Sequence, residues 1–363
     1  MDAASPGAHL FILPGLYDSG PDHWQSHWER TLGPSHATRV HQRDWAAPVC
    51  AEWVATLDAA ITAARAPVAL VAHSTACLLV AHWAQTAALP QLLAVRSALL
   101  VAPSDPLGPS YPAGPTGFAP VPTAPLPFPS VVVASRSDEY VAFETAAAWT
   151  KAWGSRLIDL GDAGHINADA GFGPWPEGLA LAEQLGAEPT ARLARRDDIP
   201  ALNALIDASV RGLSTAVYTP QQIDSAMRHM FGVDTQLVDD GTYFVLEADG
   251  HPVACGGWSG RQTLFGGDQH KSGEDTPVDP SVMPARIRAF FVHPSYARRG
   301  LGQRLFVLAA HEARRAGFTR VELMATIPGV PLYTALGFVA REDVGVQLAD
   351  GVTVPCLRMD RPI

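Results

Sequence analysis

The chain has 363 residues, of which 47% are hydrophobic and 17% charged, and its formal net charge at pH 7 is −10. At roughly 100–200 residues per domain, this length predicts two domains. The apolar content excludes a wholly disordered chain. Four cysteines are too few for a disulfide scaffold, so we expect a reducing, cytoplasmic location.

Composition also excludes two classes of partner. An acidic protein is a poor nucleic-acid binder, because the phosphates repel it. The first residues, Met1-Asp2-Ala3-Ala4, lack the basic and apolar segments of a signal peptide. No apolar run approaches the roughly 18 residues that a membrane span needs. We therefore expect neither nucleic acid nor membrane as a partner, and a small molecule or peptide as substrate.

The two halves of the chain differ in charge and in aromatic content. Residues 1–188 hold 8 Lys and Arg against 17 Asp and Glu, whereas residues 189–363 hold 18 against 19. Eight of the nine tryptophans lie in the first half. Together with a Glu188-Pro189-Thr190 linker, this predicts one domain over 1–188 and a second over 189–363.

The first half alternates strand and helix signals. We expect strands at 9–13, 37–41, 68–71, 99–102, 131–134 and 157–160, and helices at 22–32, around 53–61, at 77–88 and near 177–185. Residues 103–129 contain ten prolines in 27 residues, which excludes a helix or central strand and favours a surface excursion or lid. The alternation predicts an α/β domain whose parallel sheet is covered on both faces.

A serine follows one of these strands and precedes a helix. The segment 72–76 reads Ala-His-Ser-Thr-Ala, which fits a sharp strand-to-helix turn that exposes the Ser74 hydroxyl. The helix start behind it supplies backbone N–H groups for an oxyanion. The structural alternative is a serine that only caps the helix.

An acid and a base follow Ser74 in the order that α/β-hydrolases use. Asp138 comes after the strand at 131–134, and His165 after the strand at 157–160. His165 would take the Ser74 proton, and Asp138 would orient the imidazole. Asp162 is the rival for the acid role.

Backbone groups complete this hypothesis. One oxyanion N–H would come from Thr75, and the other from the loop after the first strand, near Leu16 or Tyr17. Two neighbouring histidines have structural alternatives. His73 is expected to pack beside the site rather than act as the base, and His23 either lines the pocket or caps a helix.

Several short motifs here resemble the retinoblastoma-binding protein 9 family of small serine hydrolases. They are Ile12-Leu13-Pro14-Gly15, Ser19-Gly20-Pro21-Asp22-His23-Trp24-Gln25, Ala72-His73-Ser74, Ser135-Arg136-Ser137-Asp138, Gly164-His165-Ile166-Asn167 and the segment 171–178. The resemblance covers about residues 8–186. It implies a compact α/β-hydrolase with esterase-like or amidase-like activity. Thr75 and Ala76 depart from the family pattern, which has a bulky apolar residue and often glycine there.

The second half has a different order of elements. We expect strands at 190–194, 243–247, 252–258, 287–292, 321–324 and 352–359. Helices are expected after Asp197 or Asp198, after Thr219, at 302–315 and at 330–336. The polar segment 260–284 is expected to form a long loop, which either borders an acceptor pocket or is simply solvated.

The stretch from a strand into the helix at 302–315 predicts an anion site. Arg298 and Arg299 add positive charge, while Gly300 and Gly302 let the backbone approach a ligand closely. The free N–H groups at a helix start favour a pyrophosphate. The structural alternative is a basic loop that binds no ligand and whose glycines only begin the helix.

This half resembles the GNAT superfamily of acyl-CoA-dependent N-acyltransferases over about residues 190–360. Gly300 and Gly302 match its Arg/Gln-x-x-Gly-x-Gly/Ala motif, whereas Ala297 departs from its first position. The resemblance implies a mixed, mostly antiparallel sheet, splayed where acetyl-CoA enters. It assigns the pantetheine arm to the backbone of Phe291 and Val292. It assigns the pyrophosphate to Arg298, Arg299, Gly300, Leu301, Gly302 and Gln303.

The resemblance also implies catalytic roles. Tyr333, a few residues before Gly337-Phe338, is expected to protonate the CoA thiolate, with aromatic packing as its structural alternative. The glutamate that some members carry on the strand before the cradle is replaced here by Arg286, Arg288 and Ala289. Glu322 or a water chain are the alternatives left for the base.

The leading hypothesis is a bifunctional enzyme, a serine esterase or amidase fused to an acetyl-CoA-dependent N-acetyltransferase. Two alternatives remain. In the first, the hydrolase-like half is an inactive binding module. In the second, the acetyltransferase-like half only senses acyl-CoA.

Overall fold

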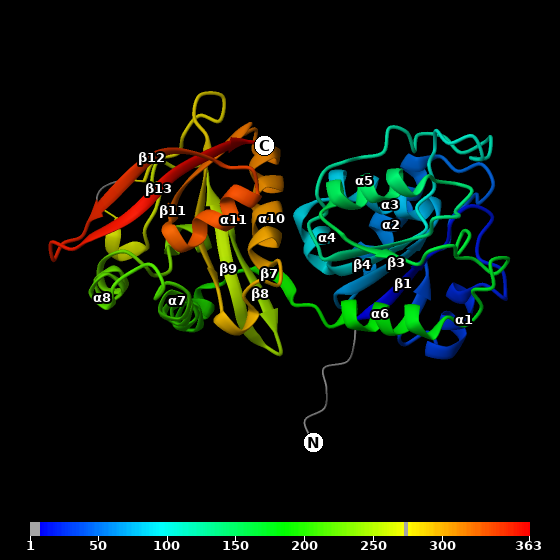
Figure 1. Ribbon diagram of the computed structural model, residues 1–363, viewed down its shortest axis with the longest axis horizontal. Coiled ribbons are helices and arrows are strands. Elements are labelled where there is room, and N and C mark those ends of the chain that lie inside the picture. Colours follow the sequence, from blue (N-terminus) through cyan, green and yellow to red (C-terminus); the bar gives the residue numbers. More distant parts are fainter. Residues whose placement is uncertain (1–7, 272–274) are drawn as a thin grey trace, which may run out of the picture. The chain divides into compact units, whose positions relative to one another are not determined.

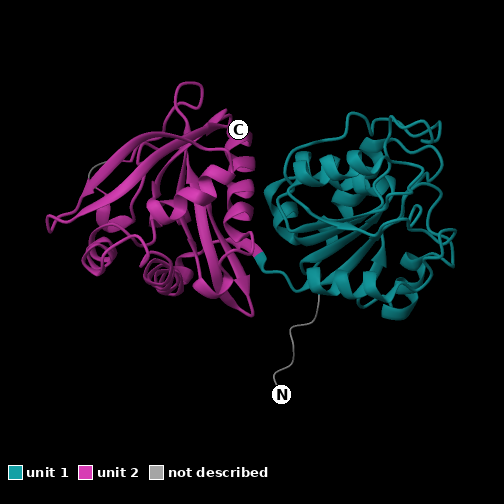
Figure 2. Cartoon of the chain, viewed as in Figure 1, with its two compact units in different colours: residues 1–190 teal, residues 191–363 magenta. Residues whose placement is uncertain are grey.

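A computed structural model describes residues 8–271 and 275–363 of the chain. The chain divides into two compact units, Met1–Thr190 and Ala191–Ile363 (Figure 2). The segment Met1–Ala4, on which the expectation about a signal peptide depends, lies outside the described residues.

Unit 1 contains six parallel strands in the order β2-β1-β3-β4-β5-β6, which confirms the expected α/β class. The strands are β1 (His9–Leu13), β2 (Ala37–Arg39), β3 (Val68–His73), β4 (Val95–Val101), β5 (Ser130–Ala134) and β6 (Arg156–Asp159). The helices are α1 (Trp24–Leu32), α2 (Cys50–Ala63), α3 (Thr75–Thr86), α4 (Leu89–Ala94), α5 (Phe143–Trp153) and α6 (Pro176–Gly186).

Alternate residues of the unit 1 strands enter two different cores. Leu70 and Leu100 pack with α2 and α3, whereas Val71 and Leu99 pack with α1 and α6. This period of two follows from strand geometry, since successive side chains point to opposite faces. Helices therefore cover both faces of the sheet, as Figure 1 shows.

The proline-rich segment 103–129 forms no helix or strand, and it is fastened at several points. The Thr116 N–H donates to the Pro48 carbonyl, and the Leu126 N–H donates to the Trp153 carbonyl. Phe118 and Phe128 are buried in the core with α2 and α3. The segment is thus a surface excursion anchored by its own side chains.

Unit 2 is built on a mixed sheet in the order β12-β13-β11-β10-β9-β8-β7. The strands are β7 (Thr190–Leu193), β8 (Tyr243–Ala248), β9 (His251–Ser259), β10 (Ala285–Val292), β11 (Arg320–Thr326), β12 (Val339–Gln347) and β13 (Thr353–Pro362). The helices are α7 (Ile199–Leu213), α8 (Pro220–His229), α9 (Thr235–Asp239), α10 (Leu301–Arg315) and α11 (Val330–Ala335). This confirms the expected mixed, mostly antiparallel sheet.

The central strands of unit 2 separate after a short parallel contact. β10 and β11 pair only at Ala285 with Val321 and at Arg286 with Glu322. Farther along, β10 is irregular, because its register with β9 shifts between Arg288 and Phe291 and Ala289 has a φ of 55°. A bulge bends a strand and redirects its side chains, so it helps to open the sheet between β10 and β11.

In the part of the chain that the structure describes, no helix is long and apolar enough to cross a membrane.

Candidate functional site

Ser74 occupies a strained turn between β3 and α3. Its φ of 58° and ψ of −128° lie in a region that residues with a side chain rarely adopt. Its N–H donates to the carbonyl of Val101 on β4, 2.9 Å away. Gly15 makes room for the turn, because a Cβ there would lie only 2.7 Å from the Ser74 Cβ. The turn therefore has the geometry of a nucleophile elbow.

The structure brings Ser74, His165 and Asp138 together. His165 Nε2 lies 3.0 Å from Ser74 Oγ, and His165 Nδ1 lies 2.9 Å from both carboxylate oxygens of Asp138. The Asp138 side chain is fully buried, and the Tyr140 N–H also donates to it. A carboxylate only accepts, so His165 donates from Nδ1 and accepts the Ser74 proton at Nε2. Asp162, the rival for the acid role, is exposed at the surface.

The candidate oxyanion donors flank Ser74. Thr75 is the first residue of α3, and the first N–H groups of a helix have no intrahelical acceptor. On the other loop, the Tyr17 N–H already donates to the Trp45 carbonyl at 2.8 Å. Leu16 lines the same cavity as Ser74. Of the two residues proposed for the second donor, Leu16 is therefore favoured. The Thr75 hydroxyl lies 3.3 Å from the Tyr111 hydroxyl.

Two buried histidines support the site without replacing His165. His73 Nε2 donates to the backbone carbonyl of His165 at 2.9 Å, which holds that residue in place. His23 caps α1 by accepting the Gln25 N–H, and it also lines the cavity. Burial lowers the pKa of His23 to about 4 and holds the pKa of His73 well below its ordinary value. Both rings are therefore neutral at pH 7.

Ser104, which the sequence reasoning did not single out, also touches the nucleophile. Its Oγ lies 2.7 Å from Ser74 Oγ, and the residue is 2% exposed. Ser104 follows β4, at the same carboxyl edge of the parallel sheet as the other three residues. That position was the available signal, because such edges gather site residues in open α/β sheets.

These residues border a cavity of about 430 Å³. Its walls also include Tyr111 and Pro112 from the proline-rich segment, and Tyr140 beside the His165 ring. The charged side chains at the cavity, apart from the catalytic group, are the carboxylates of Asp18, Asp22 and Asp169. Asp18 is paired with Arg39. A cavity of this size fits a small ester or amide substrate.

In unit 2, the predicted anion cradle lies at the start of α10. Gly300 caps this helix with a φ of 81°, and Arg298 also has a positive φ of 66°. The Arg304 N–H bonds to the Gly300 carbonyl, so the N–H groups of Leu301, Gly302 and Gln303 precede the first intrahelical bond. Arg298 and Arg299 are exposed. This arrangement fits a pyrophosphate.

Tyr333 lies beside the opening between β10 and β11. It lines a cavity of about 70 Å³ with Phe290, Phe291 and Thr326. Burial raises the pKa of its phenol above the ordinary value, so the hydroxyl keeps its proton at neutral pH. Gly302 lets α10 approach α11, since a Cβ there would lie 2.7 Å from Leu332 Cδ2.

At the end of β10, one of the backbone groups expected to hold the pantetheine arm already has a hydrogen-bond partner. The Val292 N–H donates to Ser209 Oγ at 3.2 Å, so this N–H is not free for a pantetheine arm. Phe291 is among the residues that line the Tyr333 cavity. The glycines of the Cys255-Gly256-Gly257 segment have a packing explanation. A Cβ on Gly256 would lie 2.3 Å from Phe290 Cδ1, and a Cβ on Gly257 would lie 2.3 Å from the Thr242 carbonyl oxygen.

Glu322 is a poor general base in this structure. It is 4% exposed and forms ion pairs with both Arg286 and Arg358. One guanidinium group lies at each carboxylate oxygen, Arg286 at Oε1 and Arg358 at Oε2. It is also not among the residues that line the Tyr333 cavity. The glutamate alternative is therefore not supported by the geometry.

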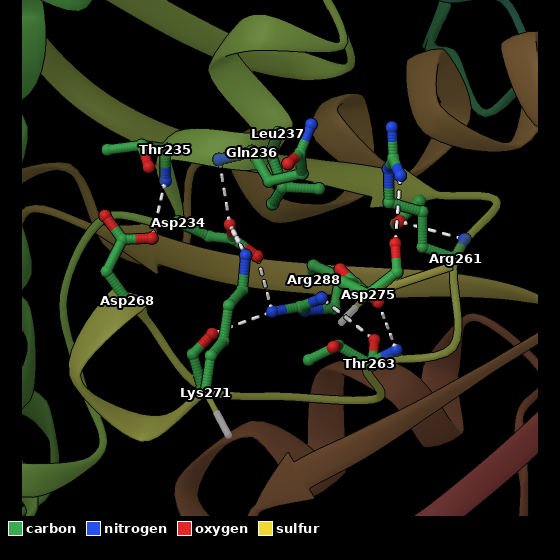
Figure 3. Close-up of polar contacts among 12 residues, drawn as sticks. Asp234, Thr235, Gln236, Leu237, Arg261, Thr263, Asp268, Lys271, Asp275 and Arg288 are labelled. Atoms are coloured by element: carbon green, nitrogen blue, oxygen red, sulfur yellow. Dashed lines mark hydrogen bonds and ion pairs between the residues drawn. The ribbon is translucent and has the colours of Figure 1, made fainter. Parts of the chain in front are cut away.

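Arg288 on β10 has a structural role (Figure 3). Its buried guanidinium bonds to Asp234 at 2.6 Å, to the Thr263 carbonyl at 2.8 Å and to the Gly266 carbonyl at 2.7 Å. Lys271 forms a second ion pair with Asp234. These contacts fasten the loop at 263–271 to β10, and this loop forms one wall of the Tyr333 cavity through residues 264–267.

Comparisons with known proteins divide the chain in the same way. Residues 10–184 match the model of the serine hydrolase family, and residues 209–338 match that of the acetyltransferase (GNAT) family. A solved YdeN-like hydrolase from Pectobacterium atrosepticum is 35% identical, with 49% of this chain and 90% of that chain covered and a TM-score of 0.42.

Solved acetyltransferases match the second half. A GCN5-related N-acetyltransferase from Rhodopseudomonas palustris is 17% identical, with 48% of this chain and 96% of that chain covered and a TM-score of 0.36. The PaiA N-acetyltransferase from Thermoplasma acidophilum, solved in complex with coenzyme A, is 12% identical, with coverages of 48% and 98% and a TM-score of 0.33. No curated protein matches the chain.

Proposed function

Because the chain belongs to the serine hydrolase family through its N-terminal half and its residues 209–338 match the model of the GNAT acetyltransferase family, we propose that it is a bifunctional enzyme. The first half would cleave an ester or amide, and the second would transfer an acetyl group from acetyl-CoA to a small amine or peptide. The four cysteines are all buried free thiols, in keeping with the proposed cytoplasmic location.

The observation that carries the hydrolase proposal is the hydrogen-bonded chain from Ser74 through His165 to Asp138. His165 Nε2 takes the proton of Ser74 Oγ as that oxygen bonds to the substrate carbonyl carbon. The N–H groups of Leu16 and Thr75 would stabilise the resulting oxyanion. His165 then protonates the leaving alcohol or amine, and water releases the acyl group from Ser74 by the same steps in reverse order.

The neutral state of His23 and His73 favours this chemistry. During the reaction His165 becomes a cation beside the His73 ring, which in turn lies beside the His23 ring. If either neighbour were charged, it would repel that cation and oppose proton transfer. Their lowered pKa values keep the positive charge on His165 alone, where Asp138 stabilises it.

The acetyltransferase proposal depends on the α10 cradle and on the opening between β10 and β11. Arg298, Arg299 and the N–H groups at 300–303 would bind the pyrophosphate of acetyl-CoA, which supplies an activated acetyl thioester when bound. Tyr333 Oη would donate its proton to the leaving sulfur. Phe290, Phe291 and the loop at 264–267 would exclude water from that atom.

One pair of assays tests the two activities in the full-length chain. Hydrolysis of p-nitrophenyl acetate and of an acyl p-nitroanilide reports on Ser74. Titration calorimetry with acetyl-CoA, followed by CoA thiol release with a panel of amines, reports on the second site. Binding of acetyl-CoA without transfer to any amine would contradict the acetyltransferase proposal and favour a sensor. Absence of all hydrolysis would favour a binding module.

A further inference from the structure

The hydroxyl of Ser104 is buried against the reacting oxygen of the hydrolase site. Its Oγ lies 2.7 Å from Ser74 Oγ, and the residue is 2% exposed. The backbone on either side is fixed. Ala102 has a left-handed φ of 49° while its N–H donates to the Val133 carbonyl, and the Asp105 N–H donates to the Tyr140 carbonyl. Strain of this kind persists where the surrounding structure determines the conformation.

The direction of the hydrogen bond between Ser104 and Ser74 follows from the other hydrogen bonds of the site. Asp138 accepts from His165 Nδ1, so Nε2 of the neutral ring is an acceptor. Ser74 must therefore donate its only proton to His165. Ser104 is left as the donor to Ser74 Oγ.

We propose that Ser104 is a further catalytic residue, whose hydroxyl orients Ser74 and stabilises the charge that develops on its Oγ during acylation. This inference rests on the proposed hydrolase function. It adds a fourth side chain to a site for which three were predicted from sequence.

The contribution of Ser104 changes along the reaction. Before attack, its bond to Ser74 Oγ is between two neutral hydroxyls. As the proton passes to His165, and before the oxygen–carbon bond is complete, Oγ carries partial negative charge, and charge-assisted hydrogen bonds are roughly twice as strong. Only interactions that strengthen in the transition state accelerate a reaction. Ser104 keeps its own proton throughout.

The acyl-enzyme behaves differently. Once Ser74 Oγ is an ester oxygen, it is a weaker acceptor, and water rather than Ser74 is the attacking group. Ser104 should therefore speed the attack of Ser74 on the substrate more than the attack of water on the acyl-enzyme. This asymmetry separates its role from that of a residue that only keeps the site folded.

The test compares wild type, Ser104→Ala and Ser104→Cys in pre-steady-state hydrolysis of p-nitrophenyl acetate by the full-length chain. We expect S104A to lower the acylation rate constant about tenfold, the effect of one hydrogen bond strengthened in the transition state. Deacylation should change less than twofold, roughly within the error of such a comparison. S104C, which retains a weaker S–H donor, should lie between the two.

Ser97→Ala is the matched control. Ser97 is a fully buried serine on β4, and its hydroxyl donates to the Leu185 carbonyl rather than to the site. Equal acylation rates in S104A and wild type, or equal losses in S104A and S97A, would overturn the proposal. So would an equal loss of acylation and deacylation in S104A. A wild type without any Ser74-dependent hydrolysis would instead refute the proposed function itself.

Discussion

The two candidate sites differ in what their own side chains provide. In unit 1, Ser74, His165 and Asp138 are already joined by hydrogen bonds, and the elbow holds the nucleophile in a strained conformation. In unit 2, the cradle consists mainly of backbone N–H groups, and Tyr333 stands beside an apolar opening. A hydrolase must generate its nucleophile from protein groups, whereas an acetyltransferase receives its activated group with the cosubstrate. Side-chain substitutions should therefore damage the first site more severely.

The two units also differ in what their buried carboxylates contact. In unit 1, the buried carboxylate of Asp138 contacts His165, through which it would serve the proposed reaction. In unit 2, the buried carboxylates of Asp234 and Glu322 are each held by two cations and fasten the fold. The buried acids of the two units therefore differ in their contacts, although the proposed reactions of both sites move a proton.

The largest expected effect is on the nucleophile. Ser74→Ala should lower kcat for ester hydrolysis at least about 10⁴-fold, because the acyl-enzyme cannot form. Acetyl transfer should be unchanged, since its proposed residues all lie in unit 2. Parallel assays of both reactions on one preparation check this. Loss of both activities together would show that the two sites are not independent.

A smaller effect concerns stability and pH. Burial lowers the pKa of His23 from 6.5 to about 4, so the unfolded chain binds a proton here before the folded chain does. The stability contributed by the neutral ring is complete above pH 6.5 and is lost as the pH falls toward 4. His23→Asn keeps a capping oxygen for α1 but does not titrate. Between pH 7 and pH 4 it should lose on the order of 3 kcal/mol less than wild type.

Urea unfolding at the two pH values measures this difference. His27→Asn is the matched control, because His27 lies one turn farther along α1 and is only partly buried. If H23N and wild type lost equal free energy between pH 7 and pH 4, the neutral buried state of His23 would be disproved.

In unit 2, Tyr333→Phe should lower kcat for acetyl transfer about a hundredfold, because it removes the proton intended for the leaving sulfur. The Kd for acetyl-CoA should stay the same, since the cradle is intact. Steady-state kinetics and titration calorimetry separate the two quantities. An unchanged kcat would assign Tyr333 to aromatic packing beside Phe290 and Phe338.

The smallest effect is expected at the cradle. Gly300→Val places a β-branched residue at a φ of 81°, which such residues avoid, and it should raise the Kd for acetyl-CoA about tenfold. Gly317→Val is the control, because Gly317 lies just after the other end of α10 with a φ of 90°. Equal affinities in the two variants would remove the α10 start from the proposed binding site.

The sequence predicted the helices and strands that have a strong apolar periodicity. It also predicted the candidate site residues that directly follow such strands. Ser74, Asp138 and His165 each follow a buried parallel strand, so their meeting at one sheet edge could be anticipated. Ser104 was missed because it lies in a proline-rich segment without periodicity, and its approach to Ser74 depends on the backbone at Ala102 and Pro103. β12 was missed because it is a mostly exposed, charged edge strand.

Long-range ion pairs could not be predicted in the same way. Arg288 and Asp234 are 54 positions apart, and no local pattern links a strand residue to the cap of a short helix. The absence of a glutamate among Arg286, Arg288 and Ala289 was visible in the sequence, but the structural role of Arg288 required the fold. The same holds for Glu322, whose neutralisation by Arg286 and Arg358 arises from pairing of β11 with β10 and β13.

The most direct test of the central claim, that Ser74 is an activated nucleophile, is fluorophosphonate labelling of the full-length chain read by intact mass. The arrangement predicts one adduct on wild type and none on Ser74→Ala or His165→Ala, since the serine needs the histidine as its base. An unlabelled wild type, or an adduct that persists in S74A, would contradict it.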